Sequence, residues 1–237
     1  MDPALLPLAA ASLAFAGGHF LLSSAPVRGP LVGLLGEGPF RAVYSVLMIA
    51  ALGWMIVAYG RTAEQTADTR LWDAGLLGPP VVLIFNYFAV VFLLCSLTTL
   101  NPTLYWTDGL HRDVAPGRGI YAVTRHPMLS AFALWSSSHL FVRGDMAGIV
   151  FFGAFLVLST LGMVHLDARR RARADDAWRS FEAGTSRLPF RAILEGRRSF
   201  EPGEIGWWRI AAGTALYLAI LYVHETVFGM NLFPVYS

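Results

Sequence analysis

The sequence contains no lysine, only one cysteine and few charged residues for its length. Of its 237 residues, 14% are charged and 55% are apolar. This composition is unusual for a water-soluble domain and typical of an integral membrane protein. The single cysteine, Cys95, excludes an intrachain disulfide and a thiolate cluster for structural zinc or an iron–sulfur centre. We expect its side chain to be buried and to serve packing alone.

Long stretches without internal charge determine the predicted fold. A helix needs roughly 20 mainly apolar residues to cross the hydrocarbon core of a bilayer. Six segments approach that length, and they are Ala4–Ser23, Ala42–Tyr59, Val81–Leu100, Pro127–Val142, Met146–Leu166 and Ile210–Val227. The sequence therefore predicts an all-α integral membrane bundle of about six transmembrane helices, with one domain over residues 1–237. Because only Arg143-Gly144-Asp145 joins the fourth and fifth segments, these two should form an antiparallel hairpin.

The arginines are distributed unevenly among the predicted connections. Connections 24–41, 101–126 and 167–209 carry fifteen arginines, whereas those at 60–80 and 143–145 carry three. Because arginine-rich connections tend to stay in the cytoplasm, this asymmetry predicts that both termini lie on the outer side of the membrane. The first segment has no convincing cleavage signature, so we expect it to be retained. The arginine excess is an orientation signal and gives no support to nucleic-acid binding.

The longest polar stretch, residues 167–209, combines arginines with aromatic residues. Trp178 and Phe181 follow the run Asp167–Arg173, which predicts an amphipathic segment at the cytoplasmic surface, with aromatic side chains toward the acyl boundary or the bundle. We interpret the run Asp167–Arg173 as a membrane-surface anchor. Trp207–Trp208 begins the last span, where an interfacial aromatic belt would place it.

The histidines are the natural place to look for chemistry, because ionisable side chains in a membrane domain are costly and usually face the bundle or a wet cavity. His19, His126 and His165 are expected near the cytoplasmic ends of their helices, and His139 and His224 near the outer ends. Two imidazoles at one depth on different helices can hold a haem between them. The outer pair would offer a second such site. A histidine at a helix end can equally hydrogen-bond a headgroup or the backbone, so both readings stay open.

Arg125-His126-Pro127 is the most specific local pattern. Proline suits the first helical position and disfavours helical geometry in the residue before it, which predicts that His126 caps the start of the fourth span. Unsatisfied N–H groups at that helix start, next to Arg125, attract an anion. This anion could be a haem propionate, a cofactor carboxylate or a lipid phosphate. The alternative is that the pattern only starts a helix at the membrane interface.

Patterns along the whole chain resemble the NnrU family. The resemblance is carried by His19-Phe20, Ser23–Arg28, Gly36-Glu37, Phe40-Arg41, Tyr44-Ser45, Gly119–Met128, His139-Leu140, Gly144-Asp145, Asp167–Arg171 and Ser186–Phe190. It covers nearly the entire sequence, and the stretch Gly119–Met128 is its most specific part. The resemblance implies a bacterial inner-membrane protein associated with denitrification, that is, with the expression or assembly of nitrite and nitric oxide reduction.

The same family is similar to the plant and cyanobacterial 15-cis-zeta-carotene isomerases. That similarity implies haem b bound by the histidine of the Arg-His-Pro element and by a histidine of an early helix, which correspond to His126 and His19. It also implies a redox-dependent cis–trans isomerisation of a lipophilic polyene. With such a haem, we expect Arg125 to pair with one propionate and Arg28 or Arg41 to pair with the other.

A more distant likeness is to the isoprenylcysteine and phospholipid methyltransferases, through Gly119, Tyr121 and Arg125-His126-Pro127. This likeness implies S-adenosylmethionine as an alternative cofactor near the cytoplasmic face, with Tyr121 among the cofactor-binding residues. His165 and Asp167 stand where that fold has paired glutamates.

Three functional hypotheses follow from these patterns. The first is a haem-b membrane protein whose axial ligands are His19 and His126 and which acts on nitric oxide or a polyene. The second is an S-adenosylmethionine-dependent membrane methyltransferase. The third is a non-enzymatic regulator or assembly factor for nitrite or nitric oxide reductase that docks a protein partner through residues 167–209. In each case the bundle contacts membrane lipid and no nucleic acid.

Overall fold

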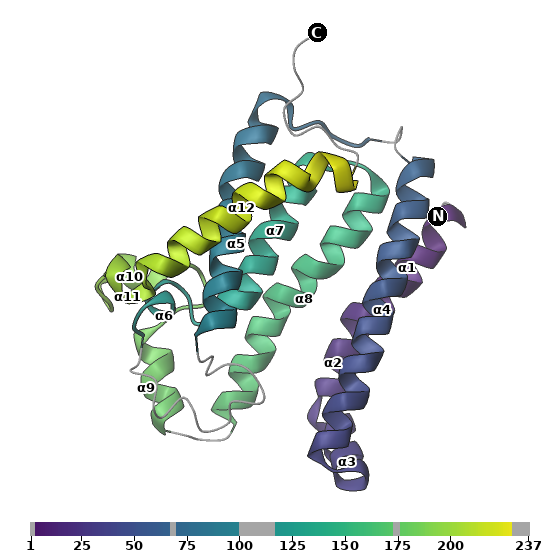
Figure 1. Ribbon diagram of the computed structural model, residues 1–237. Helices are drawn as coiled ribbons and strands as arrows, with labels where there is room; N and C mark the ends of the chain where they lie inside the picture. Colours follow the sequence, from purple (N-terminus) through teal and green to yellow (C-terminus); the bar gives the residue numbers. More distant parts are fainter. Residues whose placement is uncertain (1–2, 67–69, 100–116, 173–175, 229–237) are drawn as a thin grey trace. The chain divides into compact units, whose positions relative to one another are not determined.

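The computed structural model describes residues 3–66, 70–99, 117–172 and 176–228, and these residues are almost entirely helical (Figure 1). The α-helices are α1 Leu6–Ser12, α2 Gly18–Ser23, α3 Ala25–Leu35, α4 Glu37–Thr66, α5 Gly78–Thr98, α6 Ile120–Val123, α7 Pro127–Val142, α8 Met146–Arg171, α9 Asp176–Gly184, α10 Arg191–Leu194, α11 Pro202–Ile205 and α12 Trp207–Phe228. A π-helical turn, Leu13–Gly17, joins α1 to α2. The described residues contain no strand, and the predicted all-α class is confirmed.

Several helices have the length and apolar composition of membrane spans. Among the described residues, four stretches meet both conditions, and they are Pro3–Ser23, Glu37–Gln65, Gly75–Thr98 and Met146–Arg171. Each overlaps one of the predicted spans. The predicted fourth span has the same bounds as α7, but its 16 residues are fewer than the roughly 20 that a straight crossing needs. The chain is therefore a helical membrane protein.

The chain divides into two compact units. The first unit consists of Met1–Gly75 and His139–Leu158. In it, α1 and α2 run alongside α4, as Figure 1 shows. The ring of Tyr59 from α4 stacks on Phe151 with 4.4 Å between centroids, and Phe15 contacts Phe155 at 5.2 Å. These aromatic contacts pack the N-terminal helices against the first half of α8.

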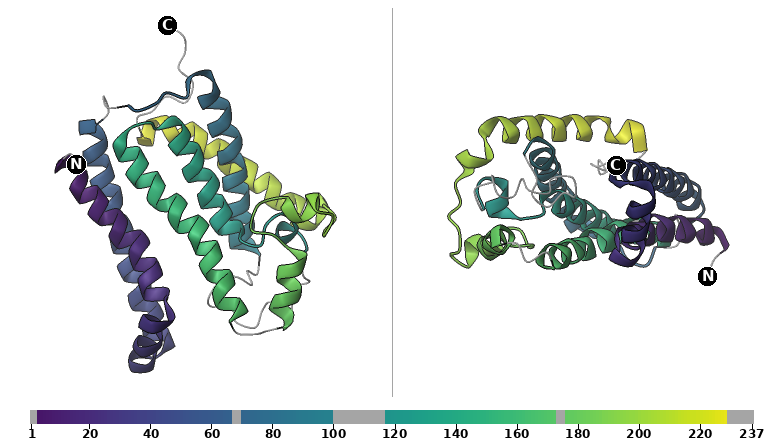
Figure 2. Two further views of the ribbon diagram at one scale, coloured as in Figure 1. Left: turned by 180° about the vertical axis from the view of Figure 1, so that it is seen from behind. Right: turned by 90° about the horizontal axis from the view of Figure 1, so that it is seen from below.

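The second unit consists of Leu76–Ser138 and Ser159–Ser237. Here α12 packs across α5 (Figures 1 and 2). The Tyr217 hydroxyl donates a hydrogen bond of 2.8 Å to the Leu83 carbonyl, and the hydroxyls of Tyr87 and Thr214 lie 3.2 Å apart. Side-chain hydrogen bonds between helices replace water, which is absent from a bilayer core, and they tie α12 to α5.

Helix α9 is amphipathic and contributes to the core of the second unit. Trp178 and Phe181 are each 1% exposed and belong to a hydrophobic cluster that includes Cys95 and Ile120, whereas Arg179 faces outward. The aromatic face of the predicted amphipathic segment therefore meets the bundle. Cys95 is buried, as predicted.

The turn Arg143-Gly144-Asp145 joins α7 to α8 as predicted, and the two helices run antiparallel (Figure 1). The Asp145 carboxylate accepts a hydrogen bond of 2.7 Å from the Gly148 amide in the first turn of α8. It also lies 2.8 Å from the Arg143 guanidinium. A carboxylate at this position stabilises a helix start by satisfying free N–H groups.

We expect Gly144→Ala to destabilise the first unit. The Leu71 amide donates a hydrogen bond of 2.7 Å to the Gly144 carbonyl, and a Cβ at Gly144 would clash with the carbonyl oxygen of Trp72. Because backbone must move, the expected cost is about 1–3 kcal/mol, measured by thermal unfolding in detergent. Gly153→Ala is the matched control, because a Cβ there meets nothing within 4 Å. Equal unfolding temperatures for the two variants would contradict this explanation.

Candidate functional site

The most specific sequence pattern lies in a tightly folded segment before α7. Gly119 has a φ of 60°, and a Cβ there would lie 2.9 Å from the Glu204 carbonyl oxygen. After the single turn of α6 the chain extends at Thr124, and α7 begins at Pro127. His126 therefore immediately precedes the helix, as the proline predicts.

His126 is buried, with 1% of its surface exposed. Its Nε2 lies 2.8 Å from Oδ1 of Asp167 in α8. Because a carboxylate can only accept, Nε2 carries the proton and Nδ1 keeps its lone pair. Among the described residues, this buried Nδ1 has no hydrogen-bond partner. Burial lowers the pKa of His126 and therefore favours the neutral ring. The hydrogen bond to Asp167 has the opposite, smaller effect.

Asp167 is the centre of a buried charge network. Its Oδ2 lies 3.3 Å from a terminal nitrogen of Arg125 and 3.3 Å from Nε of Arg187. Arg125 is 6% exposed, and it also donates a hydrogen bond of 3.0 Å to the Glu182 carbonyl while lying 3.6 Å from the Glu182 carboxylate. Two guanidinium groups therefore lie beside the carboxylate that accepts the His126 hydrogen bond.

The interpretation of Asp167–Arg173 as a surface anchor is wrong for its first half. Asp167 is completely buried and Arg170 is 7% exposed. Together with the buried residues Ser159 and Met163, they form one inward face of α8. The spacings of four, four and three residues are the signal in the sequence that would have identified this face. Asp167 also supplies the anion that we expected from a bound ligand beside Arg125.

His19 lies in the first unit, one turn after the centre of the π-helical turn. Its Nδ1 lies 2.7 Å from the Phe15 carbonyl oxygen and donates to it. The ring makes edge contacts with Phe15 at 4.7 Å and Tyr44 at 5.8 Å between centroids. This hydrogen bond leaves the lone pair on Nε2, which is the tautomer that a metal-binding imidazole needs.

The other predicted cofactor-binding residues, Arg28, Arg41 and Tyr121, contact protein side chains. Arg28 and Arg41 both contact Glu37, at 2.6 and 2.8 Å. Tyr121 is 1% exposed and packs edge-on against Phe181 at 5.8 Å, inside the hydrophobic cluster. Their contacts with a propionate or cofactor stay predictions of the sequence.

The outer histidines have different surroundings. The His139 ring stacks on Phe152 with 4.8 Å between centroids in the first unit, whereas His224 belongs to the second unit. Within the described residues, no group of three or more His, Cys, Asp or Glu side chains is arranged to hold a metal ion.

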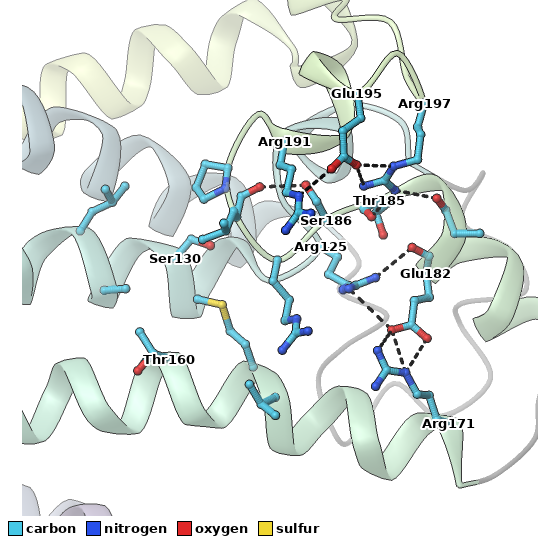
Figure 3. Close-up of a pocket in the computed structure, with 18 of the residues that line it drawn as sticks. Arg125, Ser130, Thr160, Arg171, Glu182, Thr185, Ser186, Arg191, Glu195 and Arg197 are labelled. Carbon is cyan, nitrogen blue, oxygen red and sulfur yellow. Dashed lines mark hydrogen bonds and ion pairs between the residues drawn. The ribbon is translucent and has the colours of Figure 1, made fainter.

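A cleft of about 800 Å³ opens beside Arg125 in the second unit (Figure 3). Its lining includes five arginines, which are Arg125, Arg171, Arg187, Arg191 and Arg197. Glu182 and Glu195 also line it, together with apolar side chains of α7 and α8. Figure 3 shows Ser130 and Thr160 on these two helices, with the labelled arginines gathered at one end.

The fold and the site define a polytopic helical membrane protein with a buried imidazole–carboxylate pair at the start of a helix. The sequence matches the NnrU protein family over residues 7–232, and the chain belongs to that family.

The chain is also similar to curated isomerases. It is 24% identical over 168 residues to the chloroplastic 15-cis-zeta-carotene isomerase of Zea mays, and 25% identical over 178 residues to that of Arabidopsis thaliana. Each match covers 70% of this chain and 44% of the relative, so the chain spans less than half the length of these relatives. No solved structure matches the sequence significantly.

We expect Asp167→Asn to destabilise the second unit by about 3 kcal/mol, at the low end of the range for breaking a buried ion pair, because Glu182 still faces Arg125. Thermal or denaturant unfolding in detergent measures this loss. The control is Asp176→Asn, because the Asp176 side chain is 91% exposed and pairs only with the exposed Arg179. Its expected effect is within about 0.5 kcal/mol. Similar losses in both variants would rule out a special structural role for Asp167.

Proposed function

We propose that this NnrU-family protein binds haem b, with Nδ1 of His126 as an iron ligand, and uses it to isomerise a lipophilic polyene. The observation that carries the proposal is the buried, unpartnered Nδ1 of a neutral imidazole. The similarity to the two 15-cis-zeta-carotene isomerases suggests the reaction class. A role in nitrite or nitric oxide reduction remains a prediction of the family resemblance.

The surroundings of His126 suit a metal ligand. A buried acceptor without a partner costs about 1–3 kcal/mol, and a coordinate bond to iron would remove that cost. Histidines that bind metals usually donate their other ring N–H to a carboxylate or a carbonyl, which determines the tautomer and raises the basicity of the ligand. Asp167 has that position, and the guanidinium groups of Arg125 and Arg187 lie 3.3 Å from its other oxygen.

His19 suits the second axial position for the same reason. Its Nδ1 donates to a backbone carbonyl, which orients the ring and leaves Nε2 for coordination. When bound, haem would supply one-electron chemistry that amino-acid side chains lack. His19 and His126 belong to different units, so their pairing on one iron stays a prediction.

The network around Asp167 favours this proposal over the methyltransferase. In the methyltransferase hypothesis, the carboxylate of S-adenosylmethionine sits at the positive start of the fourth span. The protein's own Asp167 carboxylate contacts both Arg125 and His126 there. The third hypothesis, a regulator that docks a partner, is supported if the purified protein is colourless and retains a partner.

We expect the detergent-purified protein to show a Soret absorption band that His126→Ala abolishes, because the substitution removes the iron ligand. His139→Ala is the matched control and should keep the band, since the His139 ring stacks on Phe152 and is not among the proposed ligands. His126→Gly with added imidazole should restore the band, which separates loss of a ligand from loss of the fold. A colourless wild-type protein, or a band unchanged in His126→Ala, would overturn the haem assignment.

The isomerase part has its own test. With reductant, the haem-loaded protein should convert 15-cis-zeta-carotene to its trans isomer, as followed by chromatography. Asp167→Asn should slow the conversion while the haem-to-protein ratio falls less, because this change alters the ligand's basicity without removing the ligand. A protein with a Soret band and no conversion would keep the haem assignment and refute the polyene reaction.

A further inference from the structure

We infer that the cleft between α7, α8 and the chain after α9 binds an anionic membrane lipid, with the phosphate headgroup on Arg187 and Arg191 and an acyl chain along α7 and α8. This site is separate from the proposed iron ligand, because His126 does not line the cleft. The inference therefore does not depend on haem.

The charge of the cleft indicates an anionic ligand. Its lining has five arginines and two glutamates, a formal excess of three positive charges. A nearby third carboxylate, Asp167, offsets part of that excess through Arg125 and Arg187. The remaining positive charge includes the partly exposed side chains of Arg187 and Arg191, which an anion can approach.

Three of the five arginines are already used by the protein. Arg171 binds the Glu182 carboxylate through two nitrogens, and Arg125 contacts the same residue and Asp167. Arg197 contacts the Glu195 carboxylate and donates to the carbonyls of Ala183 and Thr185. These contacts build the polar wall that Figure 3 shows.

Arg187 and Arg191 are different. Each uses only its Nε, toward Asp167 at 3.3 Å and Glu195 at 2.6 Å, so within the described residues their terminal amino groups have no protein partner. Their side chains are 39% and 61% exposed. Two guanidinium forks with open donors can bind a phosphate group through several charge-assisted hydrogen bonds.

The apolar part of the cleft indicates that the anion carries a hydrocarbon chain. Ala133, Leu134 and Ser137 share one face of α7, and Met163 and Val164 face them from α8. Val164 and Leu188 are 46% and 61% exposed although they line a cleft. An acyl chain in this groove would cover apolar surface while its headgroup stays at the arginine end, and a free inorganic anion would leave that surface uncovered.

Binding of phosphatidylglycerol and of phosphatidylcholine with the same acyl chains tests the inference. The detergent-purified full chain is titrated with each lipid in competition with a fluorescent phosphatidylglycerol, and anisotropy gives the affinity. We expect phosphatidylglycerol to bind at least about tenfold more tightly, because both lipids carry a phosphate but the arginines repel the choline cation of phosphatidylcholine. Inorganic phosphate at the same concentration should not compete.

Variants separate headgroup from chain binding. Arg187→Gln should weaken phosphatidylglycerol binding about tenfold and phosphatidylcholine binding less, so that the preference between the two lipids shrinks, and Ala133→Phe should weaken both by filling the groove. Arg191→Gln repeats the headgroup test at a side chain that contacts only the exposed Glu195, in case Arg187→Gln disturbs the fold. Arg179→Gln on the outer side of α9 is the matched control and should change neither affinity. Equal affinities for the two lipids, no effect of either arginine variant, or competition by inorganic phosphate would each overturn the inference.

Discussion

The polar end of the second unit depends on one buried carboxylate. Asp167 contacts His126 before α7, Arg125 beside it and Arg187 after α9, so two separate parts of the chain meet at one side chain of α8. Transfer of a carboxylate from water into a protein interior costs several kcal/mol unless partners compensate it. These partners are therefore held in place, and so is the ring of His126.

The same carboxylate separates two chemical environments. On one side the His126 ring has a buried Nδ1 that has no hydrogen-bond partner among the described residues, and burial lowers the pKa of this ring. On the other side Arg187 turns toward a cleft with open hydrogen-bond donors and apolar walls. Because Arg187 contacts Asp167, an anion on Arg187 would weaken its hold on the carboxylate and thereby alter the hydrogen bond to His126. A membrane lipid and the proposed redox site would in this way influence each other.

Local patterns predicted much of the fold. The bounds of α7 followed from Pro127 at one end and Arg143-Gly144-Asp145 at the other, and the burial of Trp178 and Phe181 followed from their spacing. These features depend on neighbours within a few residues, which the sequence displays directly. Glu37 and Arg41 also pair locally, four residues apart on one helix, although Arg41 is also one of the two arginines expected to pair with a haem propionate.

The sequence by itself determined the membrane class and the positions of the long apolar helices, and it singled out His19 and His126 as candidate ligands. Only the tertiary structure decided which anion contacts Arg125 and His126. Asp167 lies 41 residues beyond His126, and no local sequence pattern predicts that two residues so far apart in the chain are in contact. The physical reason is that helical periodicity determines which side chains share a face, whereas packing between helices determines what that face contacts. In this protein the anion beside Arg125 and His126 is the Asp167 carboxylate, and we infer an anionic ligand only for the neighbouring cleft.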